Sequence, residues 1–311
     1  MTTVLVHLKV DYLGTDRLGD RFHDVRFVHV DPDEPVDPYL SGEVMVTRGM
    51  DSANFAEVLE RGVEWVHCTG HGVDEMPLET VGNRILTCAR GATAVPIAEW
   101  VVAMLLTAAK RLPGSWIDEP PERWFLSRLD TLEGATVALL GYGSINRAVA
   151  ARLAPFGCRL LAVRRTGAPV DDPGVVVVAD AAAAVAEADH VVIGVPSTPE
   201  TRNLVDADLL AGSRSGIHLV NVSRGSVVDQ DALRSALDSG QVGLASLDVC
   251  DPEPLPEGHW LYTHPSVRLS PHISWCSPNS FDQMGANFAA NLGRWLDGRP
   301  LEDVVDRDVG Y

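Results

Sequence analysis

The chain has 311 residues, enough for two domains that each bury a core. Its formal net charge of −18 argues against nucleic-acid or anionic-membrane partners, and no run of residues has the apolar length of a membrane span. Five scattered cysteines without C-x-x-C spacing indicate reduced thiols in a cytoplasmic protein without a disulfide framework, and each is expected to be a small buried apolar residue. The ten histidines show no metal-ligand spacing either, so we expect no metal.

Short strand-like runs alternate with helical patterns over the first 90 residues, which predicts a small α/β domain. The start of the chain reads as a strand and lacks the basic start of a signal peptide. A helix is expected over residues 51–61, with Asp51 as its N-cap and Phe55 on its apolar face. The expected strands are residues 4–10, 25–30, 43–47, 65–68 and 84–88.

A long helix is expected to follow the segment 91–100 and to run to about Arg111. Apolar residues cover most of its circumference, which is typical of a helix buried between domains or subunits. This is one reason to expect a homodimer. Pro113 and Gly114 end the helix, and residues 118–122 read as a polar surface loop that contains proline.

From Gly134 onward, apolar strands and helices alternate regularly, which predicts a parallel, doubly wound sheet. Residues 180–188 read as a helix, and Asp229 is the expected N-cap of another that ends near Gly240. A last helix, residues 280–296, appears after this sheet is complete, so we infer that the chain returns to its first domain. The expected strands are residues 136–140, 159–163, 175–178, 190–193, 218–222 and 243–247.

The predicted fold class is therefore α/β, with two Rossmann-like domains whose sheets are parallel and doubly wound. Residues 1–93 plus 279–311 form the first domain, which is discontinuous and flavodoxin-like, and residues 94–278 form the second. A ligand site is expected in the cleft between the two domains.

The segment 137–147 has the layout of a dinucleotide-binding turn. A strand ends in Gly141-Tyr142-Gly143, and a helical pattern begins at once. The first glycine allows the tight turn, the second lets the backbone approach a pyrophosphate, and the helix N-terminus favours the anion. Asn146 stands where a third glycine is usual, so the motif is incomplete. The position between a strand and a helix favours cofactor binding over a plain loop.

The end of the next strand indicates which dinucleotide is bound. An NAD site usually places a carboxylate there, on the ribose 2′-hydroxyl, but this chain has Arg164 and Arg165. A guanidinium can pair with a 2′-phosphate through two parallel hydrogen bonds. We therefore predict NADP(H) in preference to NAD(H), with NAD(H) possible. The alternative is a solvated arginine pair.

Three further clusters carry residues that suit acid–base and anion chemistry. Arg224 follows the strand 218–222, where open α/β sheets bind ligands and where an arginine can hold a carboxylate. Asp248 ends another strand and Glu253 follows in a proline-rich turn. His272 follows Pro271, and a nearby carboxylate would orient its ring and favour its protonated form. Taken singly, each has an ordinary alternative: a surface ion pair, a solvated acidic turn and a structural histidine.

Together these segments resemble the D-isomer-specific 2-hydroxyacid dehydrogenases, in family order and over nearly the whole chain. The two arginines resemble the NADP-using glyoxylate/hydroxypyruvate reductase branch. Asn146 and Cys250 depart from the family pattern, which puts the helix–strand spacing at Asn146 in doubt and suggests a packing change at Cys250. The matching segments are TGHGVD (69–74), AEW (98–100), LEGATVALLGYGSI (132–145), PSTPETR (196–202), LVNVSRGSVVD (219–229), LDVCDPEPLP (247–256) and SPHISW (270–275).

The resemblance implies a homodimeric oxidoreductase that reduces a small 2-keto acid, of the glyoxylate or hydroxypyruvate type, to the D-2-hydroxy acid. It implies Arg224, Glu253 and His272 as the catalytic set, and Asp248 as a contact of the nicotinamide carboxamide. The expected substrate contacts are Arg48, Gly70, His71, Gly72 and Trp275. The other expected cofactor contacts are Gly141, Gly143, Ser144, Ile145, Arg164, Arg165, Pro196, Thr201, Val222 and Ser223.

Two other functions stay open on the sequence. The same fold serves formate dehydrogenases, which the resemblance says carry Gln where this chain has Glu253. It also serves dinucleotide-sensing proteins without catalysis, which can keep the catalytic residues. A turnover assay with several keto acids separates these alternatives from a reductase.

Overall fold

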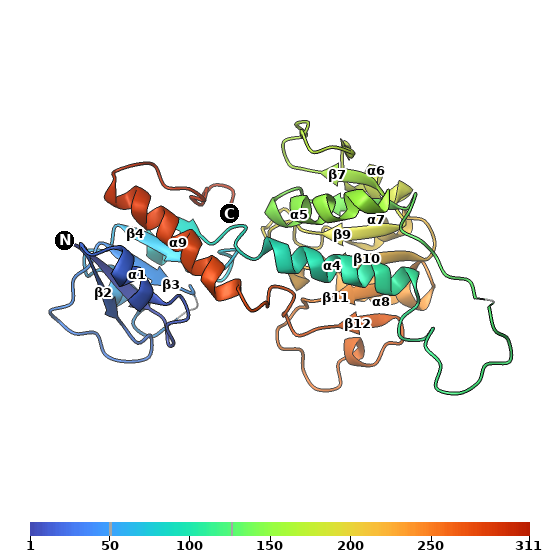
Figure 1. Cartoon of the computed structure of the whole chain (residues 1–311), viewed down its shortest axis with the longest axis horizontal. Coiled ribbons are helices and arrows are strands. Elements are labelled where there is room, and N and C mark those ends of the chain that lie inside the picture. Colours follow the sequence, from blue (N-terminus) through green and yellow to red (C-terminus); the bar gives the residue numbers. More distant parts are fainter. Residues whose placement is uncertain (50–51, 126) are drawn as a thin grey trace. The chain divides into compact units, whose positions relative to one another are not determined.

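The computed structural model describes residues 1–49, 52–125 and 127–311, and the chain divides into two compact units (Figure 1). Unit 1 comprises Met1–Thr93 and Ser277–Tyr311, and unit 2 comprises Ala94–Cys276. Each unit contains one parallel sheet with helices on both faces. The predicted fold class of two parallel α/β domains is confirmed.

The sheet of unit 1 has five parallel strands in the order β2-β1-β3-β4-β5. This is the strand order of flavodoxin-like sheets. Strand β3 lies between β1 and β4, so the carboxyl ends of these three strands meet at one edge of the sheet. The strands are β1 (Thr2–His7), β2 (Val25–His29), β3 (Val44–Thr47), β4 (Trp65–Cys68) and β5 (Ile85–Cys88).

Helices cover both faces of this sheet because its strands are apolar on both sides. Helices α2 (Phe55–Leu59) and α3 (Leu78–Val81) pack on one face. Helices α1 (Thr15–Arg21) and α9 (Ser280–Leu296) pack on the other, where Trp65 stacks on Phe288 with ring centroids 5.6 Å apart. Helix α9 thus supplies part of the core of unit 1 although it follows unit 2 in the sequence.

The sheet of unit 2 has seven parallel strands in the order β12-β11-β10-β9-β6-β7-β8. The order reverses between β6 and β9, and doubly wound sheets bind ligands at such a switch point, outside the carboxyl ends of the strands. The strands are β6 (Thr136–Leu140), β7 (Arg159–Val163), β8 (Val175–Val177), β9 (His190–Ile193), β10 (Ile217–Asn221), β11 (Val242–Leu247) and β12 (Val267–Leu269).

Helices α4 (Ala94–Ala109) and α5 (Ser144–Leu153) lie side by side and cover one face of this sheet (Figure 1). The opposite face packs against α6 (Ala181–Glu187), α7 (Ala207–Ala211) and α8 (Gln230–Asp238). Asp229 caps α8 as predicted, because its carboxylate accepts hydrogen bonds from two amides of the first turn.

Two sequence predictions differ from the structure, and one strand of the structure was not predicted. The first strand begins and ends earlier than the predicted residues 4–10, because the chain turns out of the sheet after His7 and Val10 is exposed. The second helix begins at Phe55, and its predicted N-cap Asp51 lies outside the described residues. Strand β12 was not predicted, since it has three residues and Arg268 interrupts its apolar pattern.

The segment between α4 and β6 loops out from unit 2, and its described residues form no helix or strand (Figure 1). The sequence predicted a polar loop at residues 118–122, but large apolar side chains on either side of them are exposed. We call residues 113–130 the arm. Its exposed apolar side chains are Trp116, Ile117, Trp124, Phe125 and Leu129.

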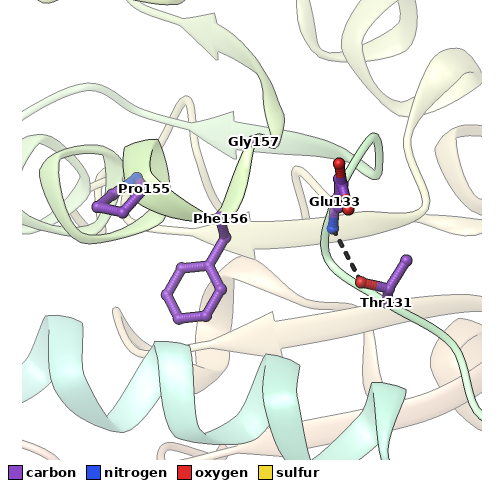
Figure 2. A pocket seen from close by; sticks show the side chains of 5 residues that line it. All are labelled: Thr131, Glu133, Pro155, Phe156 and Gly157. Atoms are coloured by element: carbon purple, nitrogen blue, oxygen red, sulfur yellow. Dashed lines mark hydrogen bonds between the residues drawn. The ribbon is translucent and has the colours of Figure 1, made fainter.

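A surface hollow of about 430 Å³ lies near the base of the arm (Figure 2). None of the predicted site residues lines it, so it is not the predicted active site. Within the described residues, no helix is long and apolar enough to cross a membrane. The residues that line the hollow are Thr131, Glu133, Pro155, Phe156 and Gly157.

Candidate active site

The turn from β6 into α5 can be built only with glycine at its first position. Gly141 has φ +81°, and a Cβ there would lie 2.8 Å from the carbonyl oxygen of Gly194, which follows β9. A Cβ on Gly143 would meet no atom within 4 Å, so the backbone there is open. Ser144 begins α5 and the Ile145 side chain is buried in the core. An open turn and a helix N-terminus at the switch point suit a pyrophosphate.

Asn146 replaces the third glycine without opening a gap between α5 and the sheet. Its side chain is fully buried, and its amide nitrogen donates to the carbonyl oxygens of Gly141 at 2.7 Å and Leu140 at 3.3 Å. A Cβ on Gly194 would lie 2.7 Å from the same nitrogen, so Gly194 supplies the space that Asn146 fills. The amide therefore bonds the helix to the end of β6, which removes the doubt about spacing.

Arg164 and Arg165 lie at the carboxyl end of β7, beside β6 in the sheet. The Arg164 guanidinium makes only long hydrogen bonds of 3.4 Å to the carbonyl oxygens of Ala168 and Pro169, and Arg165 is exposed. The amide of Gly167 donates to Arg164 O and closes the turn between them. The pair thus stands where an adenosine ribose is expected in this topology.

The loop after β9 is braced by its own hydroxyl groups. Thr201 Oγ1 donates to Pro196 O at 2.6 Å and accepts from the Thr198 amide at 2.8 Å. Ser197 Oγ lies 2.9 Å from Ser226 Oγ and joins this loop to the turn that carries Arg224. The predicted contacts Pro196, Thr201, Val222 and Ser223 thus follow β9 and β10, which are adjacent strands.

His272 and Glu253 form the central pair of the site. His272 Nδ1 lies 2.8 Å from Glu253 Oε2, and the two side chains are 40% and 36% exposed. Burial alone would raise the pKa of Glu253, but hydrogen bonds from His272 and from the Cys250 amide, with the charges of His272 and Arg224, bring its pKa below the ordinary value. The other ring nitrogen, Nε2, bonds to no described residue and is available to a ligand.

The backbone at His272 adopts an unusual conformation that Asp248 stabilises. His272 has φ +53°, which is uncommon for a residue with a Cβ. Its amide donates to Asp248 O at 2.8 Å. The buried Asp248 carboxylate accepts from Ser270 Oγ at 2.5 Å and from the Ile273 and Ser274 amides at 2.9 Å each. The predicted nicotinamide contact of Asp248 stays a prediction, while its hydrogen bonds show that it holds the turn that carries His272.

Trp275 ends the same turn. Its indole nitrogen donates to His272 O at 3.0 Å, and its ring packs against the core that α4 and α5 cover. In unit 2, Trp275 therefore buttresses the His272 turn. Its contact with substrate stays a prediction.

Arg224 is held beside the acidic turn by two residues that the sequence analysis did not single out. Asn221 Oδ1 accepts from both the amide and the hydroxyl of Ser223, and its amide nitrogen donates to Arg224 O at 2.9 Å. A Cβ on Gly225 would lie 1.9 Å from the carbonyl carbon of Cys250. Only glycine therefore lets the turn with Glu253 approach Arg224 so closely. The Asn-x-Ser spacing at a strand end is the one signal that could have indicated the Asn221 bracket.

Cys250 lies next to Glu253, and its thiol is a weak acid there. Burial, together with the charges of Glu253 and Asp251, raises the pKa of its thiol to about 11. The thiol therefore stays protonated at neutral pH. All five cysteines are free, and Cys68 and Cys88 are buried as predicted, but Cys158 and Cys250 are only partly buried and the prediction is wrong for Cys276, which is exposed.

The residues predicted to bind substrate in unit 1 gather at the carboxyl ends of β3 and β4. Arg48 follows β3 and is exposed. After β4, Gly70 O accepts from the Ala89 amide, and the Cys88 thiol donates to His71 O. In the part of the chain that the structure describes, the amides of Gly70 and Gly72 donate to no protein group. These two N–H groups suit a carboxylate.

Comparisons with known proteins agree with this arrangement. The family model "D-isomer specific 2-hydroxyacid dehydrogenase, NAD binding domain" matches residues 102–274. A Mus musculus glyoxylate reductase/hydroxypyruvate reductase is 34% identical, covering 74% of this chain and 73% of the relative. A Thermofilum pendens glyoxylate reductase is 30% identical, covering 84% and 73%.

A solved structure shows the same fold over the full chain. It is a D-isomer specific 2-hydroxyacid dehydrogenase from Xanthobacter autotrophicus Py2, in complex with NADPH and MES. It is 25% identical with a TM-score of 0.86, and the match covers 100% of this chain and 99% of that one. The match of more than half of the chain to the family model, and relatives at 30% identity or more, confirm the resemblance found in the sequence. The chain belongs to the D-isomer specific 2-hydroxyacid dehydrogenase family of NAD(P)-dependent enzymes.

Proposed function

We propose that this enzyme reduces a small 2-keto acid, of the glyoxylate or hydroxypyruvate type, to the D-2-hydroxy acid, with NADPH as its preferred cofactor. The observation that carries the proposal is the His272–Glu253 pair at 2.8 Å, close to Arg224 at one edge of the sheet of unit 2. An imidazole, a carboxylate and a guanidinium are the groups needed to protonate and polarise a carbonyl.

Each of the three side chains has a distinct role in this reaction. Arg224 binds the substrate carboxylate and polarises the keto oxygen. His272 gives the proton on Nε2 to that oxygen, because Nδ1 is engaged by Glu253. Glu253 orients the imidazole ring and stabilises its protonated form. The bound dinucleotide supplies the hydride.

The residues of unit 1 complete the proposed site. We assign unit 1 as the substrate domain and unit 2 as the dinucleotide-binding domain. The amides of Gly70 and Gly72 hold the substrate carboxylate. This assignment is supported because neither amide has a protein acceptor among the described residues. Arg48 and Trp275 are the further substrate contacts in this proposal.

The preference for NADPH rests on the arginine pair at the end of β7. Arg164 and Arg165 would hold the 2′-phosphate, and Gly141, Gly143 and Ser144 the pyrophosphate. Replacing both arginines with alanine should lower kcat/KM for NADPH by at least about 10–100-fold, because even one hydrogen bond to a charged group contributes about 1.5–3 kcal/mol. The matched control is Arg159→Ala at the other end of the same strand, which should leave the cofactor preference unchanged.

We also propose a homodimer in which the arm binds a second copy of this chain. The apolar circumference of α4 and the exposed apolar side chains of the arm support it, because exposed apolar clusters of this kind mark interaction surfaces. Light scattering after size exclusion should give a dimer for the wild type and a monomer for a Trp124→Asp, Phe125→Asp variant. A wild-type monomer would contradict the proposal.

The first experiment measures initial rates of NADPH and NADH oxidation with glyoxylate, hydroxypyruvate, pyruvate and phenylpyruvate. Turnover with NADPH well above NADH would support both the reductase and the phosphate-binding role of Arg164 and Arg165. Faster turnover with NADH would keep the enzyme class and overturn the cofactor preference. Binding of dinucleotide without turnover of any of the four acids would overturn the proposed substrate type.

A further inference from the structure

One aromatic side chain at the proposed substrate site of unit 1 has no role so far. Tyr12 lies between β1 and α1, at the sheet edge that also carries Arg48 and the residues 70–72. The turn around it is fixed by Asp11, whose carboxylate accepts from the Leu13 amide at 3.0 Å and from the Thr15 amide at 2.9 Å. The position of Tyr12 within unit 1 is therefore well determined.

The phenol of Tyr12 contacts the start of the loop after β4, which carries the amides of Gly70 and Gly72. Tyr12 Oη is 2.7 Å from Thr69 Oγ1, and Thr69 is buried and immediately precedes Gly70. The Thr69 amide donates to Thr47 O at 2.8 Å, which ties this loop to the end of β3 beside Arg48. A carboxylate bound to the Gly70 amide would thus lie within one residue of the partner of the phenol.

The phenol keeps its proton at this site. Burial raises the pKa of Tyr12, and the hydrogen bond with Thr69 and the positive charge of Arg48 oppose only part of that rise. The ring packs against Phe281, with centroids 4.9 Å apart, while the side chain remains partly accessible. A phenolic oxygen offers one donor and acceptor lone pairs, so one bond to Thr69 leaves capacity for a second partner.

We propose that Tyr12 is a specificity-determining residue whose phenol hydrogen-bonds an oxygen substituent on C3 of the substrate. The enzyme then prefers a 3-hydroxy-2-keto acid over a 2-keto acid with an apolar side chain, because a site built to bond a hydroxyl discriminates against the analogue that lacks it. This inference rests on the proposed function, since it assigns the substrate class of the same site.

The test compares wild type with Tyr12→Phe on three substrates that differ only at C3. Hydroxypyruvate has a C3 hydroxyl, pyruvate has a methyl group there, and glyoxylate has no C3. The variant keeps the ring that packs on Phe281. We expect kcat/KM for hydroxypyruvate to fall about five- to tenfold, mainly through KM, from the loss of one neutral hydrogen bond. The values for pyruvate and glyoxylate should not change.

Two controls separate this role from a structural one. Tyr39→Phe removes an exposed phenol elsewhere in unit 1 and should change nothing. Thr69→Ser keeps the hydroxyl partner and should keep the preference for hydroxypyruvate. If Tyr12→Phe lowers kcat/KM equally for all three acids, the phenol only stabilises the loop, and the inference is wrong.

The failure of this inference differs from that of the proposed function. Wild-type enzyme that reduces pyruvate as well as it reduces hydroxypyruvate overturns the role of Tyr12 and leaves the reductase intact. Wild-type enzyme that reduces none of the three acids overturns the proposed function and this inference with it.

Discussion

His272 and His67 are the same side chain in two different surroundings, one in each unit. His272 lies on a turn at the sheet edge, partly exposed, with Glu253 on one ring nitrogen. His67 lies in the middle of β4, fully buried, between Thr87 and the ring of Phe288. Desolvation lowers the pKa of His67 to about 3. The comparison teaches that accessibility and a carboxylate partner, rather than residue type, decide whether a histidine is suited to donate a proton.

Unit 2 also contains both a buried histidine and the partly exposed His272. His218 is buried beside His190 and Ser246, and burial and the positive charge of Arg268 hold its pKa well below the ordinary value. These neutral histidines fill polar positions in the core. Of these histidines, His272 is the one that pairs with a carboxylate and has a second ring nitrogen that bonds to no described residue.

The largest test of this contrast is His272→Asn. If His272 Nε2 is the proton donor, turnover should fall on the order of 10²–10⁴-fold while dinucleotide binding, followed by fluorescence, stays the same. His264 offers a matched control, because it also contacts a carboxylate, Asp238 at 3.3 Å, on another part of unit 2. Normal turnover by His272→Asn would end the assignment, and so would an equal loss in His264→Asn.

The next test concerns what holds His272 in its left-handed conformation. Asp248→Asn replaces one carboxylate oxygen with an NH2 group. That group is a donor and would face an N–H donor of the turn, so one hydrogen bond is lost. Turnover should fall about 100-fold, as expected when a reacting group is misplaced. The dissociation constant for NADPH should change little. A large rise in that constant with normal turnover of the bound enzyme would instead support the predicted nicotinamide contact.

The smallest expected effect is on acid stability and concerns the buried histidine. Unfolded chains protonate histidine near pH 6.5, whereas native His67 stays neutral down to about pH 3. The unfolded state therefore binds more protons between these values, and stability falls as pH decreases, by about 1.4 kcal/mol per pH unit from this residue. The free energy of unfolding, measured with urea at pH 7, 6 and 5, should fall less steeply with decreasing pH for His67→Gln than for wild type. The exposed His23→Gln should keep the wild-type slope.

Much of the fold was predictable because its strands are apolar and alternate with helices. The runs at residues 65–68, 136–140 and 190–193 are strands with the predicted bounds. Strand β12 escaped prediction because its place depends on pairing with β11 and not on its own three residues. The arm escaped because propensity describes Trp124 and Phe125 only as apolar, and cannot say that they are exposed.

The residues of the candidate site could be named from the sequence, but the contacts that hold them in place could not. Arg224, Glu253 and His272 each had an ordinary alternative when taken singly, and it was the resemblance to the family that named them as a set; their catalytic roles stay predictions. Gly225 was not singled out, because the contact that requires glycine is with Cys250, 25 residues away in the sequence and adjacent only once β10 and β11 have paired. Asp248 was recognised, but its hydrogen bonds to the His272 turn depend on β12 lying beside β11.

The packing of α9 on unit 1 has a consequence for biosynthesis. A ribosome completes unit 2 when it reaches Cys276, but the sheet face that carries Trp65 is covered only in part, by α1, until α9 has been made. Domains generally fold as units during synthesis. Most of unit 1 is therefore translated first, but unit 1 completes its fold last. A premature stop before α9 would leave a folded unit 2 joined to a unit 1 with an exposed apolar surface, which chaperones and proteases would bind.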